Sequence, residues 1–282
     1  MTLSIVNGTA KDVFNVLSKH RHFGQVVHPV VLYQGEHTCH LEEGSALFSQ
    51  NRREGTVFIA PVGENAVNIL ARKCKIGSTV IRLTEEQLEK LKRFRHVEIT
   101  NEYDVCSNFL PGFDSTLEGS TYKPLRKDVR TAEKAGLTFS KATVKDFASI
   151  KRLHKSWKEY MAARDKTLTD TSWISKRLRN FQGFEIYKVK KGKRLIAAAG
   201  VGLAGQNAFM DFRMSRQNKC RASAYLDYRI LSRLKERGFV HLERGRSFGT
   251  ALTEYKQKFH PLEIRKAYDV RVGQPKLVVA TA

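Results

Sequence analysis

The stretch that decides the fold is residues 208–243, which read AFMDFRMSRQNKCRASAYLDYRILSRLKERGFVHLE. Residues 208–214 predict a strand, residues 223–238 predict a helix, and residues 240–243 predict a second strand. A basic loop joins the first strand to the helix. A strand, a loop, a helix and another strand in this order are typical of an α/β domain.

The same alternation continues on both sides of this stretch. A basic helix over 123–135 ends at Gly136, and a long helix over 144–162 carries apolar residues at helical spacing. We also expect helices over 174–181 and 251–259. The expected strands are 137–141, 184–189, 194–203, 264–272 and 276–280, with a hairpin at 191–193 and a turn at 273–275.

The first 120 residues also predict mixed α/β structure. Thr9 is placed to cap a helix, and residues 84–87 have the capping-box pattern at the start of a helix that runs to Phe94. Another helix is expected over 66–75. The expected strands are 26–32, 46–49, 56–62, 79–83 and 96–100. Pro and Gly residues in 109–120 then predict a linker, so the expected domains are 1–120 and 121–282.

Positive charge is concentrated in the second of these domains. The chain carries 50 Lys and Arg residues against 28 Asp and Glu residues, a net charge of +22. Residues 121–282 hold 37 of the basic and 14 of the acidic residues, so their net charge is +23, whereas residues 1–120 are at −1. Such an excess on one half favours a polyanion: DNA, tRNA or an anionic membrane surface. We expect nucleic acid, either DNA or tRNA.

Composition also argues against several classes of protein. A hydrophobic fraction of 41% is enough for a core and argues against disorder. No run approaches the roughly 20 apolar residues of a membrane span, and no signal peptide is recognisable, so we expect a cytoplasmic protein. The four cysteines form no C-x-x-C pair, and the cluster at residues 37–40 offers too few ligands for zinc. No metal is therefore expected.

From residue 137 onward, the predicted order of strand, helices, three strands, helix, strand, helix and two strands resembles the GNAT N-acetyltransferase fold. The entry helix over 122–137, the YLDY motif at 225–228 and the YKQKF motif at 255–259 are similar to the second domain of tandem GNAT proteins. That group includes the FemX-type peptidyltransferases and the C-terminal domains of phosphatidylglycerol lysyltransferases. The resemblance implies an α/β fold of two GNAT-like domains, each a mixed central sheet flanked by helices. Residues 1–120 would be the degenerate domain and residues 121–282 the catalytic one.

The resemblance also implies acyl-transfer chemistry without a metal. GNAT enzymes move an acyl group from a thioester such as acetyl-CoA to an amine, and the tandem relatives use aminoacyl-tRNA as the donor. In that fold a central strand splays from its neighbour, and the loop into the next helix cradles the phosphates of the donor.

The loop in that position is a candidate cofactor site. It consists of Arg216, Gln217, Asn218, Lys219, Cys220, Arg221, Ala222 and Ser223. Free N–H groups at a helix N-terminus and basic side chains both suit phosphate. The family pattern at this loop is Q/R-x-x-G-x-G/A, and Cys220 stands in the place of its first glycine. A glycine there would let the backbone approach a pyrophosphate closely. The charged end of a tRNA would not need that glycine, and a basic surface loop is the alternative.

Three residues are candidates for acid–base catalysis. Asp211, in the strand before the loop, and Glu243, at the end of the next strand, are placed by topology as general bases for the acceptor amine. Tyr255 lies on the last helix, where a tyrosine often protonates the leaving group in GNAT enzymes. A core tyrosine with a satisfied hydroxyl is the alternative for Tyr255.

Asp227, on the helix between those strands, is a further carboxylate near the same place. For each of these carboxylates the alternative to catalysis is an ion pair with a nearby arginine, such as Arg213 or Arg244, because ion-pair networks are common structural elements.

Nine basic side chains are candidates for nucleic-acid contacts. Five fall largely on one face of the entry helix: Lys123, Arg126, Lys127, Arg130 and Lys134. The other four are Arg244 and Arg246, in a glycine-containing turn, and Lys256 and Lys258, on the last helix. Such a face can follow a phosphate backbone, and a solvated basic face is the alternative.

Together these features predict an N-acyltransferase that transfers an acyl or aminoacyl group to an amine. Nucleic acid would be the acceptor, through a modified DNA base, or the carrier of the donor. A base acceptor would have to be single-stranded or flipped out of the duplex. The alternatives are an aminoacyl-tRNA-dependent aminoacyltransferase that acts on a peptide, lipid or protein amine, and a catalytically inactive GNAT pair that binds nucleic acid.

Overall fold

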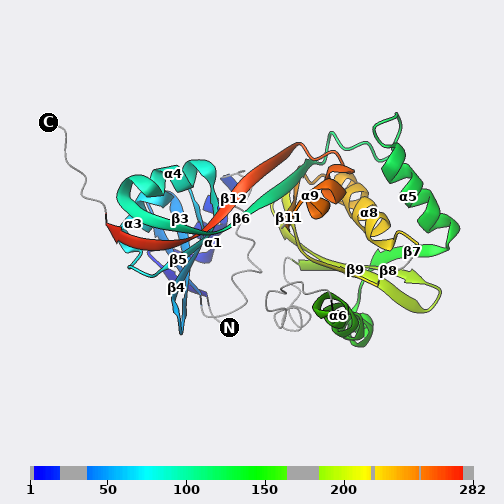
Figure 1. Ribbon diagram of the computed structural model, residues 1–282, viewed down its shortest axis with the longest axis horizontal. Coiled ribbons are helices and arrows are strands. Elements are labelled where there is room, and N and C mark those ends of the chain that lie inside the picture. The colour runs from blue at the N-terminus through cyan, green and yellow to red at the C-terminus, as the bar shows by residue number, and fades with distance from the viewer. Residues whose placement is uncertain (1–2, 20–36, 164–183, 217–219, 248, 276–282) are drawn as a thin grey trace. The chain divides into compact units, whose positions relative to one another are not determined.

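The computed structural model describes residues 3–19, 37–163, 184–216, 220–247 and 249–275 (Figure 1). The chain forms two compact units. The first comprises Met1–Cys106, Arg246–Thr253 and Glu263–Ala282, and the second comprises Ser107–Gly245 and Glu254–Leu262.

The first unit is a mixed sheet with helices on both faces. Its elements are β1 (Leu3–Val6), α1 (Ala10–Lys19), β2 (His37–Glu42), β3 (Ser45–Arg52), β4 (Gly55–Val62), α3 (Ala66–Lys73), β5 (Thr79–Thr84), α4 (Glu85–Phe94), β6 (Arg95–Phe109) and β12 (Glu263–Pro275). The strand order is β1-β2-β3-β4-β5-β12-β6. Pairing is parallel between β1 and β2 and between β4 and β5, and antiparallel between β2 and β3, β3 and β4, and β5 and β12.

Alternation along β3 separates the two cores of this unit. Leu47 packs with residues of α3 and α4, whereas its neighbour Phe48 packs with Val13 and Leu17 of α1. Successive side chains of a strand point to opposite faces of the sheet, so one strand contributes to both layers. The capping box at the start of α4 is confirmed, because the Thr84 side chain accepts from the Gln87 backbone and the Gln87 side chain accepts from the Thr84 backbone.

The second unit repeats this plan with a basic helix added at its start. Its elements are α5 (Lys123–Lys134), β7 (Leu137–Lys141), the short 3₁₀ helix η1 (Val144–Asp146), α6 (Phe147–Ala162), β8 (Phe184–Lys191), β9 (Arg194–Ala204), β10 (Asn207–Ser215), α8 (Ala222–Glu236), β11 (His241–Ser247) and α9 (Thr250–Gln257). The strand order is β6-β11-β10-β9-β8-β7. The pairs from β7 to β10 are antiparallel, and β10 pairs with β11 in parallel.

Helices cover both faces of the second sheet. Figure 1 shows α8 on one face and α6 on the other. The core under α8 includes the fully buried Leu226, Ile230 and Leu234 of that helix, and Leu125 of α5 belongs to the same cluster. This core fixes α8 against the strands of the second sheet.

Each unit has the mixed sheet and flanking helices that the resemblance implied. In both, a strand and a helix precede three strands, which are followed by a helix, a strand, a helix and a strand. The compact units nevertheless differ from the predicted ranges 1–120 and 121–282. β12 lies beside β5 in the first unit, and β6 runs on from the first unit to lie beside β11 in the second. The final strand of each repeat thus lies beside a strand of the other repeat.

Most predicted elements are present, but β1 and β2 were not predicted, and several strands run past their predicted ends. β6 extends to Phe109, well beyond the predicted strand at 96–100, and β12 passes through residues 273–275, where a turn was predicted. The predictions for 26–32, 174–181 and 276–280 lie outside the described residues.

Candidate active site

The centre of the second unit is the place where β10 and β11 stop pairing. Their parallel ladder joins only Asn207, Ala208 and Phe209 to His241, Leu242 and Glu243, although both strands continue further. Directly beyond it, the register between β10 and β9 shifts between Met210 and Phe212, so Asp211 occupies a β-bulge. Bulges occur often next to active sites, because they redirect side chains and end pairing.

On β11, Gly245 lies beside Met210 of β10, next to this bulge. Its φ is +68°, in the left-handed region, and a Cβ on this residue would lie 3.2 Å from the carbonyl oxygen of Met210. Only glycine accepts that conformation and that approach at little cost. The two strands therefore leave regular pairing together, at Asp211 on one side and Gly245 on the other.

A buried carboxylate connects the two strands beyond the end of their ladder. Asp227 of α8 is fully buried, and its Oδ2 accepts from Arg213 Nη1 of β10 at 2.6 Å and from Arg244 Nη2 of β11. The Tyr255 hydroxyl of α9 donates to the same oxygen at 3.0 Å. One carboxylate thus joins four elements: β10, β11, α8 and α9.

The protonation states in this cluster follow from burial and charge. Burial opposes ionisation of Asp227, but Arg213 and Arg244 outweigh it and hold the pKa of Asp227 below its usual range. Burial also raises the pKa of Tyr255, and the negative charge of Asp227 raises it further. Asp227 is therefore ionised and Tyr255 is a protonated donor. Ion pairing, the alternative role of Asp227, is confirmed.

Arg213 stacks on the ring of Tyr255, with which it shares the carboxylate. Its guanidinium carbon lies 4.4 Å from the centroid of that ring, within the range of cation–π attraction. The Arg213 side chain retains 21% exposure, whereas that of Arg244 retains 1%. Arg213 is the member of the cluster whose charge reaches solvent, and it had not been singled out as a site residue from the sequence.

The candidate cofactor loop connects β10 to the N-terminus of α8. The Arg216 backbone N–H donates to the Ile196 carbonyl at 2.9 Å, and the Ser215 and Ser223 hydroxyls lie 2.6 Å apart. Residues 217–219 lie outside the described part of the chain. Arg221 is the N-cap of α8 with φ +56°, and a guanidinium cannot accept a hydrogen bond from the first-turn N–H groups. Ala222 is buried, and Cys220 is partly exposed.

Asp128 of α5 joins this loop to Lys258, which directly follows α9. Its two oxygens lie 3.3 Å from Arg221 Nε and 3.3 Å from Lys258 Nζ. The structure thus brings together one predicted cofactor residue and one predicted nucleic-acid residue around a carboxylate. The Arg221 side chain keeps 61% exposure and can still reach a ligand.

The equivalent turn of the first unit lacks these features. It joins β4 to α3 through residues 63–65, where Glu64 places a negative charge before the helix. The Asn65 backbone N–H donates to Ser45 Oγ at 3.2 Å, which occupies an amide at this helix start. A Cβ on Gly63 would lie 2.7 Å from the Ser45 Cα, so this turn is tightly packed against β3. The turn of the first unit is therefore poorly suited to a phosphate.

The other candidate catalytic residues differ in access. Asp211 at the bulge is half-buried, whereas Glu243 is 3% exposed and lies inside the paired part of β11. Tyr255 is partly exposed and directs its hydroxyl at Asp227. Asp211 is thus the least buried of the candidate carboxylates, although its Oδ2 atom is itself buried.

The nine predicted nucleic-acid residues fall into two groups. Lys123, Lys127, Arg130 and Lys134 are exposed on α5, at the i, i+4, i+7, i+11 spacing of one helix face. The remaining five side chains face protein groups. Arg126 donates to the Leu117 and Gly119 carbonyls, Arg244 pairs with Asp227, Arg246 pairs with Asp269 in the first unit, Lys256 donates to the Gly245 carbonyl, and Lys258 pairs with Asp128.

Burial decides against two of those five. Arg244 is 3% exposed and Lys256 is 4% exposed, so neither presents its charge to a phosphate backbone. The sequence marked them as basic residues near the last helix. It contained no signal that β11 and α9 face the interior at these positions.

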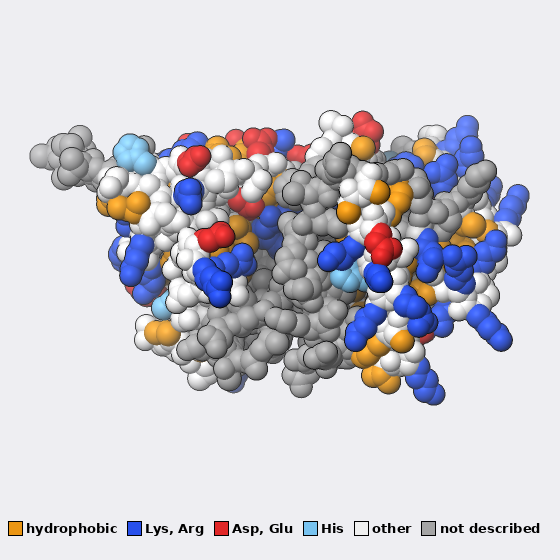
Figure 2. All heavy atoms as spheres, turned by 60° about the horizontal axis from the view of Figure 1, so that its bottom comes forward, with side chains coloured by type: hydrophobic (Ala, Val, Ile, Leu, Met, Phe, Trp, Pro, Cys, Tyr) orange, Lys and Arg blue, Asp and Glu red, His pale blue; other side chains and the backbone are white. Residues whose placement is uncertain are grey.

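Figure 2 shows Lys and Arg side chains gathered on the surface of the second unit. In the described ranges, no helix is both long and apolar enough to cross a membrane. Among the same residues, no three His, Cys, Asp or Glu side chains are grouped as a metal site.

Comparison with known proteins gives similarity at the level of structure. No protein-family model matches the chain, and no curated protein matches it. A conserved protein of unknown function from Bacteroides thetaiotaomicron VPI-5482 superposes with a TM-score of 0.73 and 14% identity, covering 95% of this chain and 98% of that one.

Two further structures indicate the group. The C-terminal domain of a putative lysylphosphatidylglycerol synthetase from Agrobacterium fabrum has a TM-score of 0.63 and 16% identity, over 94% of this chain and 92% of its own. FemX has a TM-score of 0.65 and 10% identity, over 94% and 96%. The chain therefore has the fold of the FemX and lysylphosphatidylglycerol synthetase group of GNAT-like proteins, and the resemblance seen in the sequence is confirmed at that level.

Proposed function

We propose that this protein is an acyltransferase of GNAT type that moves an aminoacyl group from tRNA to an amine. The observation that carries the proposal is the end of the β10–β11 ladder beside the N-terminus of α8. Backbone groups that leave a ladder can bind an acyl donor, while the helix N-terminus favours its phosphates. The similarity to a lysylphosphatidylglycerol synthetase supports an aminoacyl group as the transferred unit.

In this proposal, Asp211 accepts the proton that the acceptor amine loses when its nitrogen attacks the ester carbonyl. The ester C–O bond then breaks, and that proton passes to the 3′ oxygen of the tRNA, which leaves as a hydroxyl. The position of Asp211 at the bulge places a carboxylate next to the opened strands. The Asp227 cluster holds β10 and β11 at their separation and keeps Arg213 as a positive charge beside them. Arg213 then stabilises the oxyanion of the tetrahedral intermediate. Tyr255 acts through Asp227 as a positioning residue.

Exposed cations on α5 support tRNA as the carrier of the donor. Lys123, Lys127, Arg130 and Lys134 form a row on α5, and none of the acids described in the structure makes an ion pair with them within 4.0 Å. A row of this kind neutralises successive phosphates and releases counterions, which makes binding dependent on salt. The net charge of +23 over residues 121–282 agrees with such a role.

The first experiment measures binding of tRNA, aminoacyl-tRNA, duplex DNA, single-stranded DNA and acetyl-CoA at several salt concentrations. We expect tight, salt-dependent binding of tRNA. The variant Lys127→Gln with Arg130→Gln should reduce the slope of log affinity against log salt by roughly 1.5. The matched control, Arg152→Gln with Lys155→Gln on α6, removes the same charge from the opposite face of the sheet and should retain the slope.

The second experiment follows release of the aminoacyl group from tRNA in the presence of amines. Asp211→Asn should lower the rate about 100-fold or more while tRNA affinity is retained. Tight acetyl-CoA binding together with DNA binding would instead favour acylation of a modified DNA base. If neither tRNA nor DNA binds in a salt-dependent way, the proposed role of nucleic acid is wrong.

A further inference from the structure

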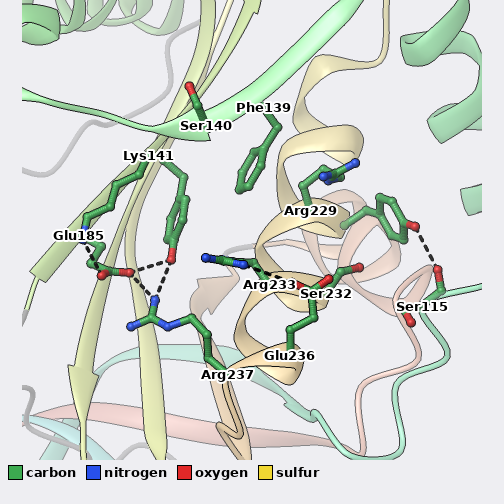
Figure 3. Close-up of a pocket in the computed structure, with 12 residues that line it drawn as sticks. Ser115, Phe139, Ser140, Lys141, Glu185, Arg229, Ser232, Arg233, Glu236 and Arg237 are labelled. Atoms are coloured by element: carbon green, nitrogen blue, oxygen red, sulfur yellow. Dashed lines mark hydrogen bonds and ion pairs between the residues drawn. The ribbon is translucent and has the colours of Figure 1, made fainter.

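A pocket of about 560 Å³ lies in the second unit, away from the end of the β10–β11 ladder (Figure 3). The C-terminal half of α8 forms one wall with Arg229, Arg233 and Arg237. β7 and β8 form the facing wall, with Phe139 and Tyr187 among its residues. This volume is within the usual range for small-molecule sites in proteins.

The pocket lies on a different face of α8 from the Asp227 cluster. Consecutive helical residues are about 100° apart, so Arg229 points about 200° away from Asp227. Arg233 and Arg237 follow Arg229 at intervals of four residues and therefore share its face. The pocket and the candidate active site thus use opposite sides of the same helix.

Positive charge exceeds negative charge in the pocket wall. The cations are Lys141, Arg229, Arg233 and Arg237, and the carboxylates are Glu185 and Glu236, which leaves an excess of two positive charges. Like charges at four-residue spacing on a helix repel one another. The helix dipole favours cations in the last turn, but Arg229 lies two turns earlier and gains little from it.

One of the two carboxylates is fully occupied by its own neighbours. Glu185 accepts from Lys141 Nζ at 2.6 Å, from Arg237 Nη1 at 2.5 Å and from the Tyr187 hydroxyl at 2.6 Å. Its side chain is 12% exposed. These contacts fix the floor of the pocket and tie Lys141 and Arg237 to it, as the dashed lines in Figure 3 show.

The two remaining arginines are available to a ligand. Arg233 is 57% exposed, and its one ion pair with a described residue is with Glu236, at 3.3 Å. Arg229 is exposed and makes no ion pair with any acid in the described part of the chain; its guanidinium lies 5.5 Å from the centroid of Phe139. Phe139 itself stacks on Tyr187 with ring centroids 5.3 Å apart. The pocket therefore combines two guanidinium groups with an aromatic wall.

We propose that this pocket binds a phosphate monoester, with Arg229 and Arg233 as ligands of the phosphate and Phe139 against the organic part of the molecule. A phosphate monoester carries about −1.5 to −2 charges at neutral pH, which matches the excess of the wall. Guanidinium groups suit phosphate because their N–H donors form paired, charge-assisted hydrogen bonds. The site is separate from the proposed acyl transfer, and its occupancy does not depend on that reaction.

The test is calorimetric titration of the full chain with inorganic phosphate, adenosine 5′-monophosphate, adenosine and a 5′-phosphorylated tetraribonucleotide. We expect the monophosphate to bind and adenosine to bind at least about tenfold more weakly. Arg229→Gln with Arg233→Gln should weaken the monophosphate about tenfold or more. The control pair on α6, Arg152→Gln with Lys155→Gln, should leave its affinity unchanged. Phe139→Leu should weaken the monophosphate and leave inorganic phosphate unchanged.

The arms of the titration also separate two sources of the phosphate. Equal affinity for the monophosphate and the tetraribonucleotide identifies a free small ligand, whereas tighter binding of the tetraribonucleotide identifies an RNA end. The proposal is overturned if both double variants weaken the monophosphate equally, or if adenosine binds as tightly as its phosphate. Tryptophan fluorescence of each variant confirms that it is folded. Failure of acyl transfer would leave these results unaffected.

Discussion

Replacing Asp227 by Asn tests whether the buried carboxylate holds the second unit together. The substitution keeps the size of the side chain and removes its charge. Arg213 and Arg244 then lose their shared counterion while Arg244 stays almost completely buried. Removing one partner of a buried ion pair typically costs about 3–5 kcal/mol, because the other charge is left uncompensated in a low-dielectric interior. We expect a loss of that size in the free energy of unfolding.

Chemical denaturation followed by tryptophan fluorescence measures this loss selectively. Trp157 lies on α6 of the second unit, so its fluorescence reports on that unit. Glu236→Gln is the matched control. It removes one acid from an exposed pair with Arg233 and should change stability by less than about 1 kcal/mol.

A double-mutant cycle sharpens the same test. If Asp227 acts by neutralising Arg244, then Arg244→Met should cost less in the Asp227→Asn background than in the native chain. The coupling energy should be about 1–3 kcal/mol. A cost below about 1 kcal/mol for Asp227→Asn, or additive effects of the two substitutions, would refute the view that this ion-pair cluster fixes β10 and β11.

Three further predictions concern the second unit and its thiols. Burial opposes ionisation of Glu185, but its hydrogen bonds to Lys141, Tyr187 and Arg237 lower its pKa to about 2 from an ordinary 4.5. Its stabilising contribution of about 3 kcal/mol is therefore present above pH 4.5 and is lost as the pH falls toward 2. Glu185→Gln should flatten the dependence of stability on pH in that window, and an unchanged dependence would contradict this. Gly245→Ala should destabilise the second unit by about 1–3 kcal/mol. The loss should exceed that of Gly192→Ala, because a Cβ on Gly245 would approach the Met210 carbonyl oxygen whereas a Cβ on Gly192 would meet open space. Equal losses would show that the contact with Met210 is unimportant. N-ethylmaleimide should modify Cys220 first in the folded protein, because the other three thiols are buried and burial raises the pKa of Cys39 to about 12. Peptide mass spectrometry measures the rate at each cysteine, and labelling of Cys39 as fast as Cys220 would contradict this.

The sequence predicted local structure well wherever the signal was local. The capping pattern at Thr84–Gln87, the glycine after α5 and the strand at 137–141 were all placed correctly. The alternation of strands and helices was enough to indicate the GNAT fold. These features depend on residues within a few positions of each other, which a single sequence displays directly.

Side-chain partners were less accessible because they depend on packing between distant elements. Arg244 and Arg246 are two residues apart, yet the first is buried against Asp227 of the second unit and the second pairs with Asp269 of the first. Both appeared in the sequence only as cations near a glycine-containing turn. Net charge indicated that the second half is basic, but it did not distinguish a cation on the exposed face of α5 from one enclosed by four elements.

The exchange of final strands explains why the domain boundary was hardest to predict. A linker signal near residue 109 is local, whereas the position of β12 beside β5 depends on pairing between residues far apart in the sequence. Tyr268 and Leu83, for example, are separated by 185 positions. Backbone pairing at that separation leaves no periodic trace in the sequence. It also has a physical consequence: a fragment cut at residue 120 would leave β5 without the strand that covers its edge, and an unpaired edge favours aggregation. The second unit is therefore best studied in the full chain, where β6 and β12 both have their partners.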